Sequence, residues 1–341
     1  MDPKSFPSHF LQVNVMEKPE KQTFLCSVIV PVYNEEQNIK PLTDRLCQSL
    51  QSVPGCRYEI IFAMDPSTDR TESIILSLRA INPQIKLIRF SRRFGQPAAT
   101  IGGLRYAGGD CCVVIDADLQ DPPELIPKLI EKWREAGAEV VYAQRRTRQG
   151  ETFPKRIISY AGYWVINKIA DVRIPRNTGD FRLMSRRVVS HLLSLKESHG
   201  FLRGLVAMVG FKQESVLYDR DLRLGGRGHY NRWTGSFLIG MNGIVGFSRF
   251  ALTAITLLGF LTSAFSFLIA LVYFVLRLLH VEIPWGNPTL VILITFLAGI
   301  QLLSMGILGA YLGRVYDEVR QRPMYIVESM HGFEGEDTNS R

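Results

Sequence analysis

Short apolar runs alternate with amphipathic stretches in the first part of the chain. Runs rich in valine and isoleucine predict buried strands at 27–32, 58–64, 85–90, 111–115 and 139–143. The stretches between them predict helices at 34–50, 69–80, 95–107 and 123–136. Strands that alternate with helices at this spacing are typical of right-handed βαβ units. The pattern therefore predicts an α/β domain around a mostly parallel, Rossmann-like sheet.

Two much longer apolar runs follow, at 250–276 and 289–313, and neither contains a charged residue. Each exceeds the roughly 20 residues that a helix needs to cross the hydrocarbon core of a bilayer. Buried helices of a large soluble core are the alternative, but such helices rarely carry so long an apolar stretch. We therefore expect transmembrane helices at 249–277 and 288–313.

The segments around these helices predict the rest of the organisation. Arginine flanks the outer ends of the pair and is scarce between the two helices, so we expect the preceding domain and both termini to be cytoplasmic. The largely apolar segment 231–248 predicts an interfacial amphipathic helix region that lies on the membrane. We expect a flexible tail at 1–23 and a cytoplasmic tail at 314–341.

Composition and charge exclude several classes of protein. With 21% charged and 10% aromatic residues, the chain is not mainly disordered. No GxGxxG follows the first strand and no GxxxxGK[ST] occurs, which disfavours dinucleotide-dependent redox chemistry and P-loop hydrolysis. The chain has 5 cysteines, none in a CxxC pair, and we expect reduced thiols.

Acidic side chains follow the predicted strands at the point where each strand ends. Asp116 and Asp118 come directly after 111–115, and two carboxylates at this spacing can point toward one divalent cation. Such oxygen ligands, joined by diphosphate oxygens, suit Mg²⁺ or Mn²⁺. Glu35 and Asp65 follow the first two strands, at the sheet edge where ligands bind. A solvated acidic loop, or capping of the next helix, is the alternative in each case.

Asp180 and a group of arginines are further candidates. Asp180 follows a glycine in a basic neighbourhood, which suits a general base or an orienting group, although a cap for a helix at 185–195 is the alternative. Arginine, with net charge +8 for the chain, suits bidentate contacts to phosphate. Attraction to an anionic membrane surface is the alternative. Nucleic acid is not expected as a partner, because these arginines lie near the predicted membrane helices without interleaved aromatics.

The motifs taken together point to a family. They are SVIVPVYNEE (27–36), DPSTDRT (65–71), FGQPAATIGGL (94–104), DADLQDPPE (116–124), GDFRLM (179–184) and RPMYIV (322–327). As a set they resemble the inverting family-two glycosyltransferases of GT-A fold. The closest resemblance is to the polyprenyl-phosphate glycosyltransferases of the bactoprenol glucosyltransferase (GtrB-like) branch, related to dolichol-phosphate mannose synthases. It implies a GT-A catalytic domain at 24–230, followed by interfacial helices and two transmembrane helices.

The resemblance also implies roles for residues at matching positions. The donor-binding residues would be Pro31, Tyr33, Glu35, Asp65, Asp116 and Gln120. The metal ligands would be Asp116, Asp118 and Gln120, and the catalytic residues Asp180 and Asp118. The phosphate or acceptor contacts would be Arg145, Arg156, Arg182, Arg223 and Arg227. Two departures stand out: Met64 replaces a usual acid, and the usual serine and lysine of an RxxGxSK motif are absent at 223–229.

The implied reaction is transfer of glucose from UDP-glucose to undecaprenyl phosphate at the cytoplasmic face of a bacterial plasma membrane. It would proceed with inversion, use Mg²⁺ or Mn²⁺, and give a β-linked polyprenyl-phosphate glucose. A homo-oligomer is expected, since two helices make a thin anchor. The alternatives are a mannose synthase that uses GDP-mannose, a processive polysaccharide synthase, and a non-catalytic membrane scaffold. His229 in place of the glutamine of QxxRW disfavours the processive synthase, and the Asp116 and Asp118 pair disfavours the scaffold.

Overall fold

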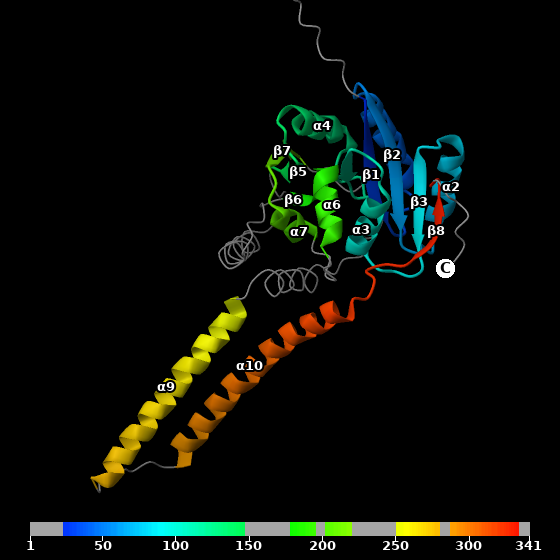
Figure 1. Cartoon of the computed structure of the whole chain (residues 1–341). Coiled ribbons are helices and arrows are strands. Elements are labelled where there is room, and N and C mark those ends of the chain that lie inside the picture. The colour runs from blue at the N-terminus through cyan, green and yellow to red at the C-terminus, as the bar shows by residue number, and fades with distance from the viewer. Residues whose placement is uncertain (1–22, 147–177, 196–201, 220–249, 280–286, 334–341) are drawn as a thin grey trace, which may run out of the picture.

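Two long helices project side by side from an α/β domain (Figure 1). This computed structural model describes residues 23–146, 178–195, 202–219, 250–279 and 287–333. The expected tail at 1–23, except for its last residue, and the expected interfacial region at 231–248 lie outside these ranges.

The described strands form one 8-stranded sheet in the order β7-β5-β6-β4-β1-β2-β3-β8. Their bounds are β1 Phe24–Val32, β2 Cys56–Met64, β3 Ile85–Phe90, β4 Cys111–Val114, β5 Val140–Arg145, β6 Thr178–Ser185, β7 Gln213–Tyr218 and β8 Val327–His331. β1 pairs in parallel with β2 and β4, β2 with β3, and β5 with β7. The predicted mostly parallel sheet is therefore confirmed, with β6 and β8 as its antiparallel members.

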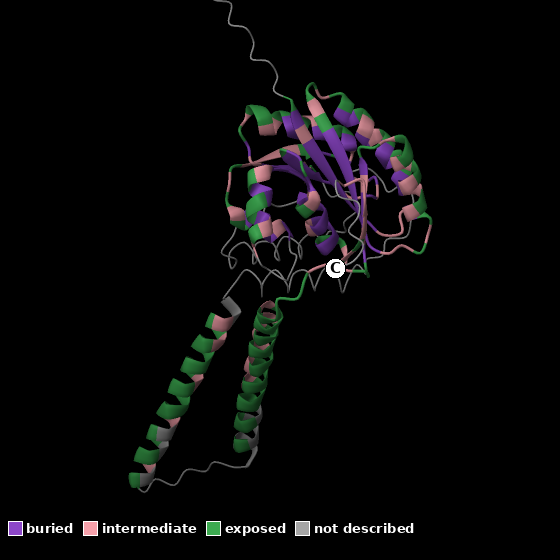
Figure 2. Cartoon of the chain, turned by 45° about the vertical axis from the view of Figure 1, so that its right-hand side comes forward, coloured by how far each residue is buried: buried purple, intermediate pink, exposed green. Residues whose placement is uncertain are grey.

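Helices cover both faces of this sheet. Those of the domain are α1 Ile39–Gln51, α2 Thr71–Ile81, α3 Gln96–Tyr106, the 3₁₀ turn η1 Pro123–Leu125, α4 Ile126–Glu135, α6 Arg186–Ser194 and α7 Leu202–Val209. Along β1, Val28 and Val30 pack toward α1, α2 and α4, whereas Ile29 packs toward α3, α6 and α7. This alternation, which follows from the period of two in a strand, gives two buried apolar layers (Figure 2).

Helix α1 begins later than the sequence pattern predicts. Asn34 was expected to start the helix as its cap, but it has a φ of 54° and α1 starts at Ile39. The Asn34 side chain instead pairs with the β2–α2 loop, where its Oδ1 accepts from the backbone N–H of Thr68 at 2.8 Å. Asparagine tolerates this left-handed conformation because its short side chain finds local hydrogen bonds.

Asp180 lies within strand β6, not at the helix cap that was the alternative interpretation of this residue. The strand pairs antiparallel with both β4 and β5, and its side chains are buried on both faces. The cap of the following helix is Ser185, whose Oγ accepts a hydrogen bond from the Val188 backbone N–H at 3.2 Å. Asp180 is therefore free of a capping role and lies within a strand at the centre of the domain.

The expected tail at 314–341 is structured as far as residue 333. α10 runs on to Arg320, and β8 then pairs with the exposed edge of β3. Tyr325 packs on Phe90 with ring centroids 5.4 Å apart, which anchors the returning chain to the apolar layer. A covered edge cannot pair with another chain, so β8 completes the domain beyond the expected bounds of 24–230.

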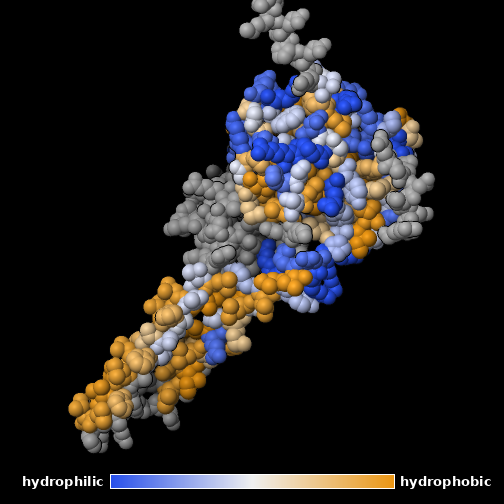
Figure 3. Space-filling view, in the orientation of Figure 1, coloured by the Kyte–Doolittle hydropathy of each residue, from blue (hydrophilic) through white to orange (hydrophobic). Residues whose placement is uncertain are grey.

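The long helices are α9 Phe250–Leu278 and α10 Asn287–Arg320. Their segments Leu252–Leu276 and Phe296–Arg320 are long and apolar enough to cross a membrane, and they are exposed along their length. Figure 3 shows this continuous hydrophobic surface below the hydrophilic domain. Because β8 rejoins the sheet after α10, the end of α10 at Arg320 lies next to the domain. The start of α9 at Phe250 lies on the same side (Figure 1). That this side is cytoplasmic stays a prediction.

Candidate active site

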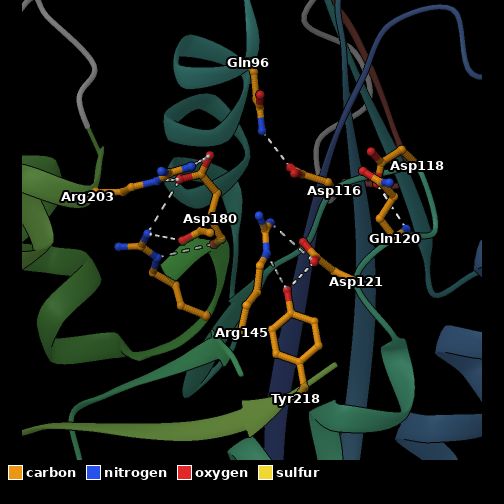
Figure 4. A network of polar contacts seen from close by, with 11 residues as sticks. Gln96, Asp116, Asp118, Gln120, Asp121, Arg145, Asp180, Arg203 and Tyr218 are labelled. Atoms are coloured by element: carbon orange, nitrogen blue, oxygen red, sulfur yellow. Dashed lines mark hydrogen bonds and ion pairs between the residues drawn. The ribbon is translucent and has the colours of Figure 1, made fainter. Parts of the chain in front are cut away.

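The Asp116–Gln120 turn lies at the carboxyl end of β4, in the middle of the sheet. Leu119 has a φ of 57°, and the Gln120 backbone N–H donates to Asp118 Oδ1 at 3.2 Å. Asp116 accepts a hydrogen bond of 2.6 Å from Gln96 Nε2 at the first position of α3. Figure 4 shows how this turn places Asp116 and Asp118 next to each other beside Asp180.

Asp116 is held in an unfavourable place for a lone carboxylate. Burial, followed by the like charges of Asp180, Asp121 and Asp118, raises the pKa of Asp116 to about 8. A divalent cation between Asp116 and Asp118 would offset this repulsion. Among the described residues, no group of three or more His, Cys, Asp or Glu gathers at metal-binding distances. The donor set therefore fits Mg²⁺ or Mn²⁺ bound by one or two carboxylates with oxygens from a substrate diphosphate completing the shell.

Asp180 forms an ion pair with Arg203, a residue of α7. Arg203 donates from Nε to Asp180 Oδ1 at 2.8 Å and from Nη2 to Oδ2 at 3.3 Å. Burial acts to raise the pKa of Asp180, but the charges of Arg203, Arg182 and Arg145 outweigh it and hold this pKa below its ordinary value. Asp180 is thus an ionised carboxylate tied to arginine.

Arg203 was not among the residues predicted from the sequence. It is the one charged side chain in α7, which otherwise reads as an apolar core helix, LRGLVAMV. A cation in an apolar helix requires a partner, and this is the signal that points to it.

Arg182, expected to contact phosphate, is fully buried at 0% exposure. Its Nη2 donates to the Gly179 carbonyl at 2.8 Å and lies 3.6 Å from Asp180 Oδ1. In this structure the Arg182 guanidinium is thus held against Gly179 and Asp180, and its expected role as a phosphate contact stays a prediction.

A second network joins Arg145, Asp121 and Tyr218 below the Asp116 turn (Figure 4). Arg145 Nε donates to the Tyr218 hydroxyl at 3.2 Å, and its Nη2 lies 3.7 Å from Asp121 Oδ1. The Tyr218 hydroxyl in turn donates to Asp121. A Cβ at Gly179 would stand 3.0 Å from Arg145 Nη2, so glycine gives this guanidinium its room beside β6. Arg145 therefore lies near Asp180, and its expected contact to phosphate stays a prediction. Asp121 and Tyr218 were not among the predicted site residues.

The expected donor-binding residues gather at the carboxyl ends of β1 and β2, which are paired neighbours. Asp65 is buried, and its two oxygens accept the backbone N–H groups of Phe94 at 3.1 Å and Gly95 at 2.8 Å. Asp65 therefore holds the loop that leads into α3. Gly95 has a φ of 90°, a conformation that favours glycine.

Pro31, Tyr33 and Glu35 continue from β1 at this edge. Pro31 is buried within β1, and the Tyr33 ring lies against the Arg93 guanidinium at 4.0 Å. The Glu35 carboxylate accepts from Asn38 Nδ2 at 2.6 Å. The structure thus brings these residues and Asp65 to one edge, next to the Asp116 turn. The expected phosphate contacts Arg156, Arg223 and Arg227 lie outside the described residues.

Comparisons with known proteins agree with this arrangement. The family described as Glycosyl transferase family 2 matches residues 27–193. An uncharacterised glycosyltransferase of Synechocystis is 43% identical, over 92% of this chain and 97% of its own length. A bactoprenol glucosyl transferase of Shigella flexneri is 40% identical, over 89% of this chain and 98% of its own length. Identity this high over nearly the whole of both chains shows common descent and a common fold. The chain therefore belongs to glycosyl transferase family 2, has the GT-A fold, and falls in the branch of the bactoprenol glucosyl transferases.

Proposed function

We propose that this glycosyltransferase transfers glucose from UDP-glucose to undecaprenyl phosphate, with inversion at the anomeric carbon. The observation that carries the proposal is the Asp116 and Asp118 pair beside the Asp180–Arg203 ion pair. A diphosphate and a phosphate would meet between these two groups. The name of the Shigella flexneri relative, and two helices of membrane-spanning length, support a polyprenyl phosphate as the acceptor.

The donor side is proposed to use the carboxyl ends of β1, β2 and β4. Asp116 and Asp118, with Gln120, would hold Mg²⁺ or Mn²⁺ against the diphosphate, and the cation supplies charge neutralisation as the nucleotide departs. Asp116 is ready for this role because the cation would replace the proton that its raised pKa retains near neutral pH. Asp65 fixes the loop at the same edge and so shapes the pocket for the nucleoside.

The acceptor side needs cations rather than a strong base. A phosphate monoester has its second pKa at about 6 and is largely dianionic at pH 7. Its oxygen can attack the anomeric carbon without losing a proton to the enzyme. Asp180, bound to Arg203 through both oxygens, is proposed to hold that guanidinium where it meets the acceptor phosphate. Arg145, beside Gly179, is proposed as the second cation.

Localisation and assembly follow the same account. We propose that the catalytic domain and both termini of the chain lie at the cytoplasmic face of the plasma membrane, where a nucleotide sugar is supplied. The exposed apolar surfaces of α9 and α10 favour a homo-oligomer that packs these helices against one another.

A transfer assay on the purified full-length protein tests the proposal. Radiolabelled UDP-glucose and GDP-mannose are offered in parallel with undecaprenyl phosphate and Mn²⁺ or Mg²⁺, and label in the organic phase is counted. The account predicts metal-dependent label from UDP-glucose, lost in Asp116→Asn and kept in the matched control Asp44→Asn at an exposed position of α1. Label from GDP-mannose alone would show that the donor is GDP-mannose and not UDP-glucose. If the protein is folded and neither donor gives label, the result would favour a non-catalytic scaffold.

A further inference from the structure

A cavity of about 250 Å³ opens where α10 meets the domain, outside the candidate active site. Its walls include the side chains of Arg92, Arg320 and Arg322, and one carboxylate, Asp317. All four side chains are exposed. Positive groups therefore outnumber the negative one at a single small recess, which favours an anionic ligand.

The cavity lies at the end of the membrane-length segment of α10, where lipid headgroups would lie if this helix crosses a bilayer. Arg320 is the last residue of α10 and of its membrane-length segment Phe296–Arg320, and Arg322 follows two residues later. Figure 3 shows that the hydrophobic surface of the long helices ends here and that hydrophilic side chains begin. Arginine at this boundary is well placed for a phosphate of the adjoining leaflet.

Two of the arginines are already oriented by aromatic rings. The Arg92 guanidinium lies 4.1 Å from the ring centroid of Phe94, and that of Arg320 lies 5.0 Å from the ring of Tyr316. A guanidinium that stacks on a ring through one face still has its N–H groups available to bind an anion. The planar arrangement of these donors matches the oxygens of a phosphate. We propose that this cavity binds the phosphate group of an anionic membrane lipid.

The cavity is connected to the candidate active site through one short loop. Phe94 lines the cavity, and its backbone N–H donates to Asp65 at 3.1 Å. Two residues later, Gln96 Nε2 donates to Asp116 at 2.6 Å. A lipid phosphate held by Arg92 therefore fixes the loop that holds two residues of the donor side. This last step rests on the proposed function, whereas the binding of the lipid does not.

Binding is tested without any catalytic readout. Full-length protein in a non-ionic detergent is titrated with dihexanoyl phosphatidylglycerol, dihexanoyl phosphatidylcholine or inorganic phosphate, and thermal unfolding is followed by tryptophan fluorescence. The expected result is a rise in Tm with phosphatidylglycerol alone. The double variant Arg320→Gln/Arg322→Gln is expected to bind it about tenfold or more weakly, since each arginine near a membrane surface contributes about 1 kcal/mol.

Matched variants separate this site from general charge and from misfolding. Arg57→Gln/Lys128→Gln removes the same charge from exposed positions of β2 and α4, and phosphatidylglycerol should still raise its Tm as in the wild type. Asp317→Asn removes the opposing carboxylate and should bind phosphatidylglycerol more tightly. An equal Tm rise in the Arg320/Arg322 variant would overturn the proposal. An equal rise with inorganic phosphate would also overturn it, because the site would then take free phosphate.

A transfer assay in nanodiscs then tests the coupling. Adding phosphatidylglycerol to phosphatidylcholine nanodiscs should lower the KM for the nucleotide sugar in the wild type and leave it unchanged in the Arg320/Arg322 variant. Tm responses as predicted with no activity on any donor would retain the lipid site and reject the proposed function.

Discussion

Arg203 and Asp180 meet through two hydrogen bonds of 2.8 and 3.3 Å, although they come from α7 and β6. The pairing places a cation and an anion directly beside the Asp116 turn (Figure 4). If Asp180 acts by holding Arg203, then the two residues work as one unit rather than as separate groups.

A double-mutant cycle tests that unit. Asp180→Asn and Arg203→Gln should each lower kcat, and the double variant should be no slower than the slower single variant, because the first change already releases the partner. The coupling free energy should be on the order of 0.5–3 kcal/mol, as for other residues in direct contact. Additive effects on kcat, measured at saturating donor and acceptor, would contradict a shared role.

The raised pKa of Asp116, about 8, predicts a pH dependence of stability. Between the ordinary pKa of about 4 for an aspartate and this value, the folded protein keeps a proton that the unfolded chain releases. The metal-free protein should therefore lose stability as pH rises through this window, and level off above it. Urea unfolding in EDTA at pH 5, 7 and 9 measures this, with Asp116→Asn showing a flatter profile. Equal slopes for the two proteins would refute the assigned cause.

The same proton competes with the metal. Mn²⁺ affinity, measured by calorimetry in the presence of UDP, should increase from pH 6 to pH 8, since binding must displace the proton of Asp116. Asp44→Asn should show the same increase and Asp116→Asn should not. A pH-independent affinity in the wild type would contradict the displacement of a proton from Asp116.

Asn34 ties two loops of the donor side together. Its backbone N–H donates to Ser67 Oγ at 3.1 Å, and its side chain exchanges hydrogen bonds with Thr68. Asn34→Ala should cost about 1–2 kcal/mol of stability, since it removes side-chain hydrogen bonds and places alanine at positive φ. It should also raise the KM for the nucleotide sugar more than it lowers kcat. Gln37→Ala, exposed in the next turn, is the control and should change neither quantity.

Tyr325 anchors β8 to the domain through Phe90. Tyr325→Ala should lower the free energy of unfolding by about 1–3 kcal/mol. This is less than the loss of a fully buried aromatic side chain costs, because Tyr325 is only half-buried. The segment after α10 should then be cut sooner in limited proteolysis, while Ile326→Ala, 52% exposed, should behave as the wild type. Equal cleavage of both variants would show that the ring does not hold β8.

The sequence was most informative where one local signal dominates. The apolar runs that became β1, β2 and β3 are buried on both faces, and Asp116 lies two residues after the end of β4, so the sheet and its acidic edge could be predicted. β6 was missed because the Gly-Asp and arginine within it are typical of a loop, and only its pairing with β4 and β5 makes it a strand. The Arg203–Asp180 pair depends on how two distant segments pack, which no local pattern contains.

β8 shows the same limit at the other end of the chain. Its short polar sequence, VESMH, carries no strong strand pattern and follows a membrane-length helix, so a tail was the natural prediction. The segment forms a strand because it pairs with the edge of β3. The ring of Tyr325 packs on Phe90 and that of Phe333 on Tyr106, and these contacts hold β8 against the domain.

The most direct test of the central claim concerns the nucleophile. Purified protein is given labelled UDP-glucose with either undecaprenyl phosphate or undecaprenol, which lacks the phosphate, and label in the lipid fraction is counted. The account predicts transfer to undecaprenyl phosphate only, as an acid-labile product whose anomeric configuration by NMR is β. Comparable transfer to undecaprenol, or an α-linked product, would contradict it.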